Sequence, residues 1–177
     1  MVSPDAADRF LNAPWLADLD PASRLAVLNV LQEGHYPAGA ILLEQGQPND
    51  RVHFLVEGTA TIQRSFPGGR VETVAQLAAP AVFGETSFFR PTAPIAAVRA
   101  TSPVRLLTLD HRAHELLRRA DPTAAEQLAV AAVRVVAERF DQLDQRVSAY
   151  IAAHPEGHPK SNEWANFRAR LFEDSSI

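Results

Sequence analysis

Hydrophobic and polar residues follow two different rhythms along this chain. Between residues 41 and 109, apolar and β-branched residues come in short runs separated by Gly, Pro, Asn and Asp. These runs predict strands over residues 41–43, 52–56, 59–66, 70–77, 97–100 and 104–109. Pro67-Gly68-Gly69 is predicted to be the turn of a hairpin between two of them. Short strands with regular turns are typical of a barrel or jelly roll and not of an alternating βαβ sheet.

Helical patterns flank this region on both sides. Ser3-Pro4, Asp20-Pro21 and Asp121-Pro122 each place a side-chain oxygen before a proline. The oxygen accepts an unpaired N–H of the first turn, and proline suits the first helical position because it has no N–H to satisfy. We therefore expect a short first helix, a second over residues 21–32 and a long one from Pro122. Apolar residues recur every three or four positions along the long helix: Leu128, Ala132, Val136, Phe140, Leu143, Val147 and Ile151.

The last part of the chain changes character after His154. Two prolines and a glycine within residues 155–159 predict a loop. Trp164, Phe167, Leu171 and Phe172 then fall on one face at helical spacing, which predicts a short amphipathic helix that docks on the protein. We expect four parts: N-terminal helices (1–33), a β-roll (34–120), a long helix (121–153), and a loop with a tail helix (154–177).

Composition narrows the classes of function. The chain has 177 residues, which suits one domain with appendages, and its net charge is −4, whereas a protein that binds a nucleic-acid backbone is usually basic. There is no cysteine, which excludes disulfides and thiol catalysis and fits a cytoplasmic location. The N-terminus does not read as a signal peptide, and no apolar run is long enough to span a bilayer.

Two separated groups of residues resemble one known family. Residues 83–89 read FGETSFF and residues 98–100 read VRA. Upstream, YPAG at residues 36–39, LEQGQPND at 43–50 and FLVEG at 54–58 place three glycines between apolar runs, where tight turns need a positive φ. These motifs resemble the cyclic nucleotide-binding domain family over roughly residues 22–143. The resemblance implies a mainly β fold, a double-stranded β-helix (jelly roll) with N-terminal helices, a one-turn helix over 84–89 and a long C-terminal helix.

The resemblance also implies roles for residues of the phosphate-binding cassette. In the family the glutamate of Phe-Gly-Glu, here Glu85, accepts a hydrogen bond from the ribose 2′-hydroxyl, and an arginine pairs with the cyclic phosphate. Pro94 stands where the family has this arginine, and Ala97 stands where it has Thr or Ser. The ligand, cyclic AMP or cyclic GMP by resemblance, is then expected to bind one to two orders of magnitude more weakly, because a charge-assisted pair contributes about 1.5–3 kcal/mol. The candidate ligand-binding residues are Gly84, Glu85, Thr86, Ser87, Arg90, Pro94 and Ala97.

Three of these roles remain open in the sequence. The Thr86 and Ser87 hydroxyls either donate to an anion or cap the turn. Arg90 follows the turn and is the better substitute for the lost arginine, whereas Arg99 lies on a strand and is expected to face solvent. His111 and His114 lie three apart on a helix, but a structural metal site needs four ligands, so no metal is expected.

The function predicted from the sequence is regulatory. No catalytic motif is present, and the family's bacterial regulators dimerise through their long helix, which here places Val136, Phe140, Leu143 and Val147 in the seam. The winged helix-turn-helix of those regulators does not fit after residue 153, so we expect no DNA binding unless the chain is a fragment. Two hypotheses follow: a stand-alone sensor that binds a cyclic nucleotide weakly or another small ligand, without a required cofactor, and a ligand-free protein-protein docking or dimerisation module.

Overall fold

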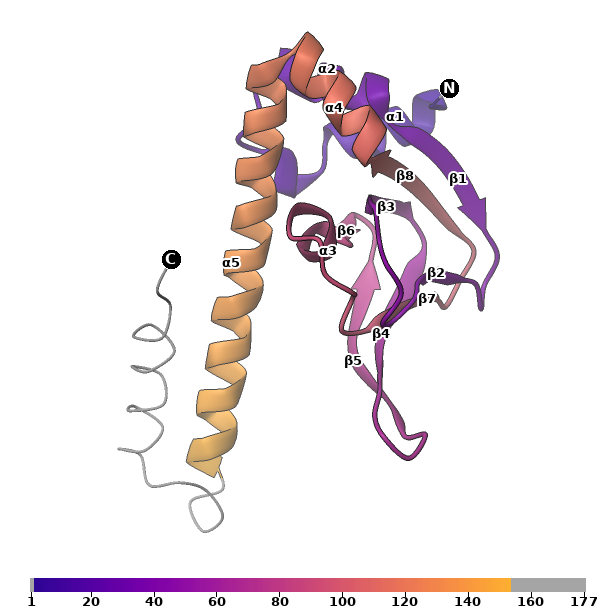
Figure 1. Cartoon of the computed structure of the whole chain (residues 1–177), viewed down its shortest axis with the longest axis vertical. Helices are drawn as coiled ribbons and strands as arrows, with labels where there is room; N and C mark the ends of the chain where they lie inside the picture. The colour runs from indigo at the N-terminus through magenta and orange to yellow at the C-terminus, as the bar shows by residue number, and fades with distance from the viewer. Residues whose placement is uncertain (1, 154–177) are drawn as a thin grey trace. The chain divides into compact units, whose positions relative to one another are not determined.

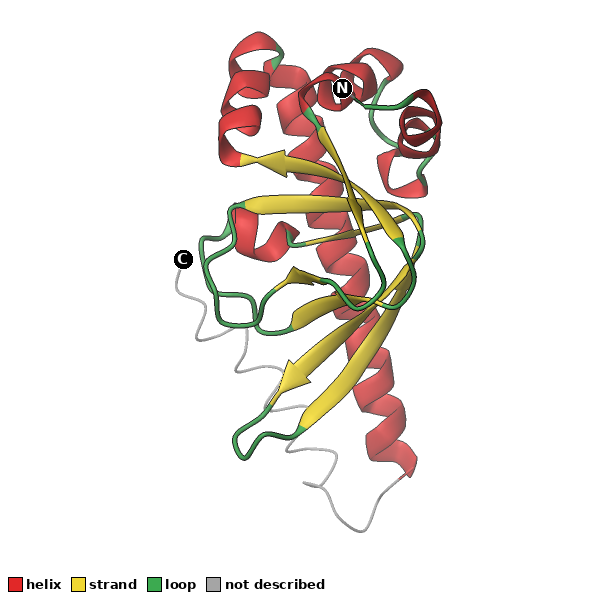
Figure 2. Cartoon of the chain, turned by 90° about the vertical axis from the view of Figure 1, so that its right-hand side faces the viewer, coloured by secondary structure: helices red, strands yellow, loops and turns green. Residues whose placement is uncertain are grey.

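Two antiparallel sheets of four strands each form the β-roll in the computed structural model, which describes residues 2–153 (Figure 2). One sheet has the order β1-β8-β3-β6 and the other β2-β7-β4-β5. Consecutive strands along the chain alternate between sheets in several places, as expected of a jelly roll, so the predicted fold is confirmed. The strands are β1 (Gln32–Tyr36), β2 (Ile41–Leu43), β3 (Arg51–Glu57), β4 (Thr59–Ser65), β5 (Val71–Ala78), β6 (Ala81–Phe83), β7 (Ala97–Ala100) and β8 (Val104–Asp110).

Three of the helices begin where the capping pattern predicts. Ser3 Oγ accepts the Ala6 N–H at 3.4 Å, and carboxylates of Asp20 and Asp121 accept the N–H groups three residues on at 2.9 and 3.0 Å. The helical elements are α1 (Pro4–Leu11), η1 (Pro14–Leu16), α2 (Pro21–Val30), α3 (Glu85–Phe89), α4 (His111–Ala120) and α5 (Pro122–Ala153). Figure 1 shows α1, α2 and α4 together at one end of the strands.

The structure corrects the end of the second helix. We expected it to reach Gln32, but α2 ends at Val30 and Gln32 opens β1, opposite Thr108 of β8. β1 reads QEGHY, without the alternation that marks a strand, so pairing with β8 overrides the local pattern. The three-residue β6 was missed for a related reason, because so short a segment carries little periodicity.

Alternating residues of β3 and β8 supply two hydrophobic cores. Leu55 and Leu106 point between the two sheets, while Phe54 and Leu107 point to the side covered by helices. On the helical side, the Trp15 ring stacks on Phe54 with centroids 4.8 Å apart. Side chains of α1, α2, α4 and the first part of α5 complete this second core, which therefore fixes the helices against one sheet.

Polar contacts hold the segment around Trp15 in place. The guanidinium of Arg24 donates to the backbone carbonyls of Leu11, Ala17 and Leu19 at 3.0, 3.1 and 2.9 Å. Asp20 and Gln127 of α5 bond reciprocally, through the Asp20 N–H to Gln127 Oε1 at 3.1 Å and Gln127 Nε2 to the Asp20 carboxylate at 2.8 Å. Arg134 of α5 also pairs with Asp18. The segment that carries η1 and Trp15 is thus tied to α5.

Arg24→Ala is expected to lower the free energy of unfolding by about 1–2 kcal/mol, because three carbonyls lose a charged donor but remain partly accessible to water. Chemical denaturation followed by circular dichroism measures the change. Arg112→Ala on α4, an exposed position, is the control and is expected to change stability by less than about 0.5 kcal/mol. Equal losses in the two variants would contradict a role for the Arg24 contacts.

The β4–β5 hairpin extends from the roll at the end opposite to α1, α2 and α4 (Figure 1). Near its turn, the guanidinium groups of Arg64 and Arg70 lie 5.3 and 5.1 Å from the Phe66 ring centroid. The side-chain amide of Gln45 bonds both the N–H and the C=O of Ser65, at 2.7 and 3.0 Å, and so acts as a short extra strand beside β4.

The long helix changes its environment along its length. The chain divides into two compact units, Met1–Val135 and Val136–Ile177, and α5 contributes to both. Ala124, Leu128 and Ala131 are buried in the core of the first unit, so the first part of the helix packs on the roll. Farther along, Phe140 and Leu143 are more than half exposed. The predicted tail helix around Trp164 lies outside the described residues.

Candidate functional site

The turn between β6 and α3 is built around Gly84. Gly84 has φ 83° and caps α3 without a side chain. A Cβ on this residue would lie 2.7 Å from the Arg51 carbonyl oxygen and 3.2 Å from Asn49 Nδ2. Only glycine therefore combines this backbone conformation with so close an approach of Asn49 and of Arg51 at the start of β3.

Asn49 fastens that loop to the turn. Its Nδ2 group lies 2.7 Å from the Arg51 carbonyl, 2.9 Å from Ser87 Oγ and 3.2 Å from the Gly84 carbonyl. The buried Ser87 hydroxyl also donates to the Gly84 carbonyl at 3.2 Å. This hydroxyl therefore bonds within the turn itself, and its predicted role toward an anion stays a prediction. Thr86 is exposed at the surface of the turn.

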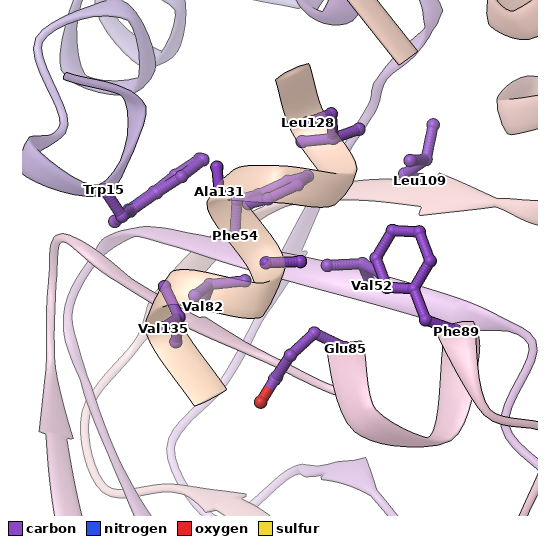
Figure 3. Close-up of a pocket in the computed structure, with 11 residues that line it drawn as sticks. Trp15, Val52, Phe54, Val82, Glu85, Phe89, Leu109, Leu128, Ala131 and Val135 are labelled. Carbon is purple, nitrogen blue, oxygen red and sulfur yellow. The ribbon is translucent and has the colours of Figure 1, made fainter. Parts of the chain in front are cut away.

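Glu85 lies in an apolar crevice, with an exposed fraction of 3% (Figure 3). The crevice has a volume of about 10 Å³, which is room for about one water molecule. Its other lining residues are all apolar: Trp15, Val52, Phe54, Val82, Phe89, Leu109, Leu128, Ala131, Ala132 and Val135. Sequence reasoning found Glu85 but missed this setting, because the lining comes from six separate elements.

The two arginines considered as cations for the ligand, Arg90 and Arg99, do not line this crevice. Arg90 is exposed, and Arg99, which also faces solvent as expected, donates to the Gly39 carbonyl at 2.7 Å. Pro94 is buried, and its carbonyl accepts the Gly46 N–H at 2.8 Å, while Ala97 is half-buried on β7. Within the described residues, the lining of the crevice contains no arginine. The ionisable side chain that the turn contributes to the lining of the crevice is that of Glu85.

His53 packs beside the turn at Gly84. It is 6% exposed on β3, its Nδ1 lies 3.1 Å from Thr108 Oγ1, and its ring stacks on Phe83 with centroids 5.0 Å apart. Burial, reinforced by the positive charge of Arg51, lowers the pKa of His53 to about 4. The imidazole is therefore neutral at physiological pH. In the sequence His53 stands among apolar residues, and this position does not predict that it packs beside the turn.

His111 and His114 pack α4 against α3. The His111 ring stacks on Phe88 with centroids 4.2 Å apart, and His114 meets Phe88 and Phe89 edge-on at 5.4 and 5.7 Å. Burial, aided by the charge of Arg118, lowers the pKa of His114. Across residues 2–153, no cluster of three or more His, Asp or Glu side chains is arranged to hold a metal ion.

Comparison with known proteins identifies the family. Residues 33–121, half of the chain, match the model of the cyclic nucleotide-binding domain, and the chain belongs to that family. It is 26% identical over 133 residues to a CRP-like cAMP-activated global transcriptional regulator of Mycobacterium tuberculosis, covering 75% of this chain and 58% of the relative. It is 30% identical over 113 residues to a cyclic nucleotide-gated potassium channel of Mesorhizobium japonicum, covering 64% of this chain and 30% of the channel.

Solved structures agree with this assignment. The N-terminal domain of a transcriptional regulator from Streptomyces coelicolor A3(2) superposes with a TM-score of 0.65 at 28% identity, covering 76% of this chain and 96% of that one. The catabolite activator protein of Thermus thermophilus gives 0.63 at 27% identity, covering 76% and 63%. The chain thus spans less than two thirds of the two curated relatives named above. Among the described helices, none combines the length and apolar character needed to cross a membrane.

Proposed function

We propose that this chain is a regulatory sensor module that dimerises through α5 and responds to a small ligand bound beside Glu85. It acts by binding and not by catalysis, in the cytoplasm, and without contact to DNA or membrane. The observation that carries the proposal is the apolar face of α5. Because this helix also supplies four lining residues of the crevice, the same element takes part in both proposed interactions.

The apolar face of α5 has coiled-coil spacing. Alternate steps of three and four residues connect Val133, Val136, Phe140, Leu143, Val147 and Tyr150. All are exposed large hydrophobic residues except Val147, which is half-buried. A helix face of this kind is stabilised by a partner with the same spacing, and a second copy of α5 supplies one. This face contains the four predicted seam residues, Val136 to Val147.

Leu143→Asp is expected to convert the dimer into a monomer, because two carboxylates would be buried against apolar neighbours. Sedimentation velocity at tens of micromolar, roughly the range of a weak interface, measures the change. Gln145→Asp introduces the same side chain on the opposite side of the helix and should remain dimeric. A wild type that sediments as a monomer, or a Gln145→Asp variant that dissociates equally, would refute the proposed seam.

The ligand that the family suggests is a cyclic nucleotide. Glu85 and Gly84 keep the positions that the resemblance assigns to the ribose side, whereas Pro94 removes the arginine of the phosphate side. We therefore infer weak binding of cyclic AMP or cyclic GMP, about one to two orders of magnitude below a site with the arginine. Titration calorimetry with both nucleotides tests this, and tight binding would show that another cation, with Arg90 as the first candidate, replaces the lost one.

The alternative is a ligand-free module that docks or dimerises only. The burial of Pro94 and its bond to Gly46 favour it, because this part of the loop is already occupied by internal contacts. A dimer whose stability does not change with any small molecule would support this alternative. A partner protein would then be the input that changes α5.

A further inference from the structure

The lining of the Glu85 crevice defines a ligand chemistry different from that of a cyclic phosphate. Ten apolar side chains and one acid line it, and arginine is absent from the lining within the described residues. An anion placed here would meet the Glu85 carboxyl group in a region from which water is largely excluded, which is unfavourable. An uncharged or positively charged molecule has no such penalty.

The apolar walls favour a flat ring. Trp15 and Phe54 stack on each other, with an interplanar angle of 12°, and Phe89 lies at the rim with 40% of its surface exposed (Figure 3). Aromatic side chains contribute large contact areas and prefer stacked or edge-on partners. We propose that the crevice binds a small uncharged or cationic aromatic molecule whose hydroxyl or ammonium group donates to the Glu85 carboxyl group. This inference rests on the proposed sensor function and specifies its ligand.

The crevice must open for such a molecule, and α5 is the wall that can yield. At about 10 Å³ the crevice is smaller than any aromatic ring. Its α5 wall includes Ala131 and Ala132, the smallest side chains of the lining. A ring inserted there would displace this face of α5 and strain the Asp20–Gln127 contact, so ligand occupancy and the position of the helix are linked.

The inference is tested with three probes of one size and different charge: benzylamine, benzyl alcohol and benzoate. Trp15 reports binding by its fluorescence in a Trp164→Phe background, since the sequence has two tryptophans. Roughly millimolar dissociation constants are expected for molecules of this size. Benzylamine should bind at least about tenfold more tightly than benzoate, because a charge-assisted hydrogen bond corresponds to about one to two orders of magnitude in affinity. Benzyl alcohol should fall between them.

Two variants locate the site. Glu85→Gln should reduce the preference for benzylamine over benzoate to less than about threefold, because the acid is removed while the shape is kept. Ala132→Leu should fill the crevice and weaken all three probes about tenfold or more, whereas Ala129→Leu, on the same helix but outside the lining, should not. Equal binding of benzylamine and benzoate to the wild type, or undiminished binding to Ala132→Leu, would overturn the inference.

Cyclic AMP titrated under the same conditions separates this inference from the proposed function. Saturable binding of cyclic AMP without saturable binding of benzylamine would refute the aromatic ligand and leave the sensor function standing. If neither cyclic AMP nor any of the three aromatic probes changes Trp15 fluorescence saturably while the protein is dimeric, the sensor function itself fails and the docking module replaces it.

Discussion

Gly84→Ala should lower the free energy of unfolding by roughly 2–4 kcal/mol and the melting temperature by about 5–15 °C. Two costs combine. An alanine at φ 83° is strained by about 1–2 kcal/mol, and its Cβ would come within 2.7 Å of the Arg51 carbonyl oxygen, so the backbone must move at a typical cost of about 1–3 kcal/mol. Part of this is offset because alanine restricts the unfolded chain.

Gly46→Ala is the matched control for the backbone term. Gly46 has nearly the same conformation, with φ 80°, but no heavy atom lies within 4 Å of an added Cβ. It should lose only about 1 kcal/mol. Thermal and urea denaturation of both variants measure the difference in the free energy of unfolding, which reports the steric contact with the Arg51 carbonyl at the start of β3. Similar losses would show that this contact is softer than the structure implies.

Stability should fall on acidification because of His53. The pKa of His53 is about 4 in the folded protein against 6.5 as its ordinary value, so between these values the unfolded chain binds a proton that the folded protein does not. The contribution is fully present above pH 6.5, is lost as the pH falls toward 4, and levels off below it. Its total size is on the order of 3 kcal/mol, at about 1.36 kcal/mol per pKa unit.

His53→Gln removes this dependence at the cost of some stability at neutral pH. We expect the free energy of unfolding of the wild type to drop more steeply between pH 7 and pH 4.5 than that of the variant. Parallel pH profiles for the wild type and His53→Gln would rule out the buried imidazole as the source.

Much of the fold could be predicted because local signals agreed with the tertiary structure. The Ser3, Asp20 and Asp121 caps needed only neighbouring residues, so the starts of the helices followed from the sequence. The strands from β2 to β5 had apolar runs bounded by turn residues. The prediction missed β1 because this strand depends on pairing with β8, about seventy residues away, and not on its own polar sequence.

The candidate site was predictable only in part. The FGE motif identified Gly84 and Glu85 because those residues are adjacent in the sequence. Asn49, by contrast, meets the turn through contacts across 35 and 38 residues, and an asparagine in a loop has no distinctive pattern. Trp15 lies in η1, and the Arg24 and Asp20 contacts that hold the segment around it connect residues without any periodic pattern in the sequence.

The β4–β5 turn offers an attachment point for probes of this domain. An added Cβ at Gly68 or Gly69 meets no heavy atom within 4 Å, and both residues are exposed, although their φ values of 85° and 82° make a side chain there cost about 1 kcal/mol. Because the chain has no cysteine, a single cysteine introduced there can be labelled uniquely with a dye or spin label. Exposed turns of this kind also accept inserted sequences. The hairpin could therefore carry a reporter whose signal follows changes in the roll without altering its core.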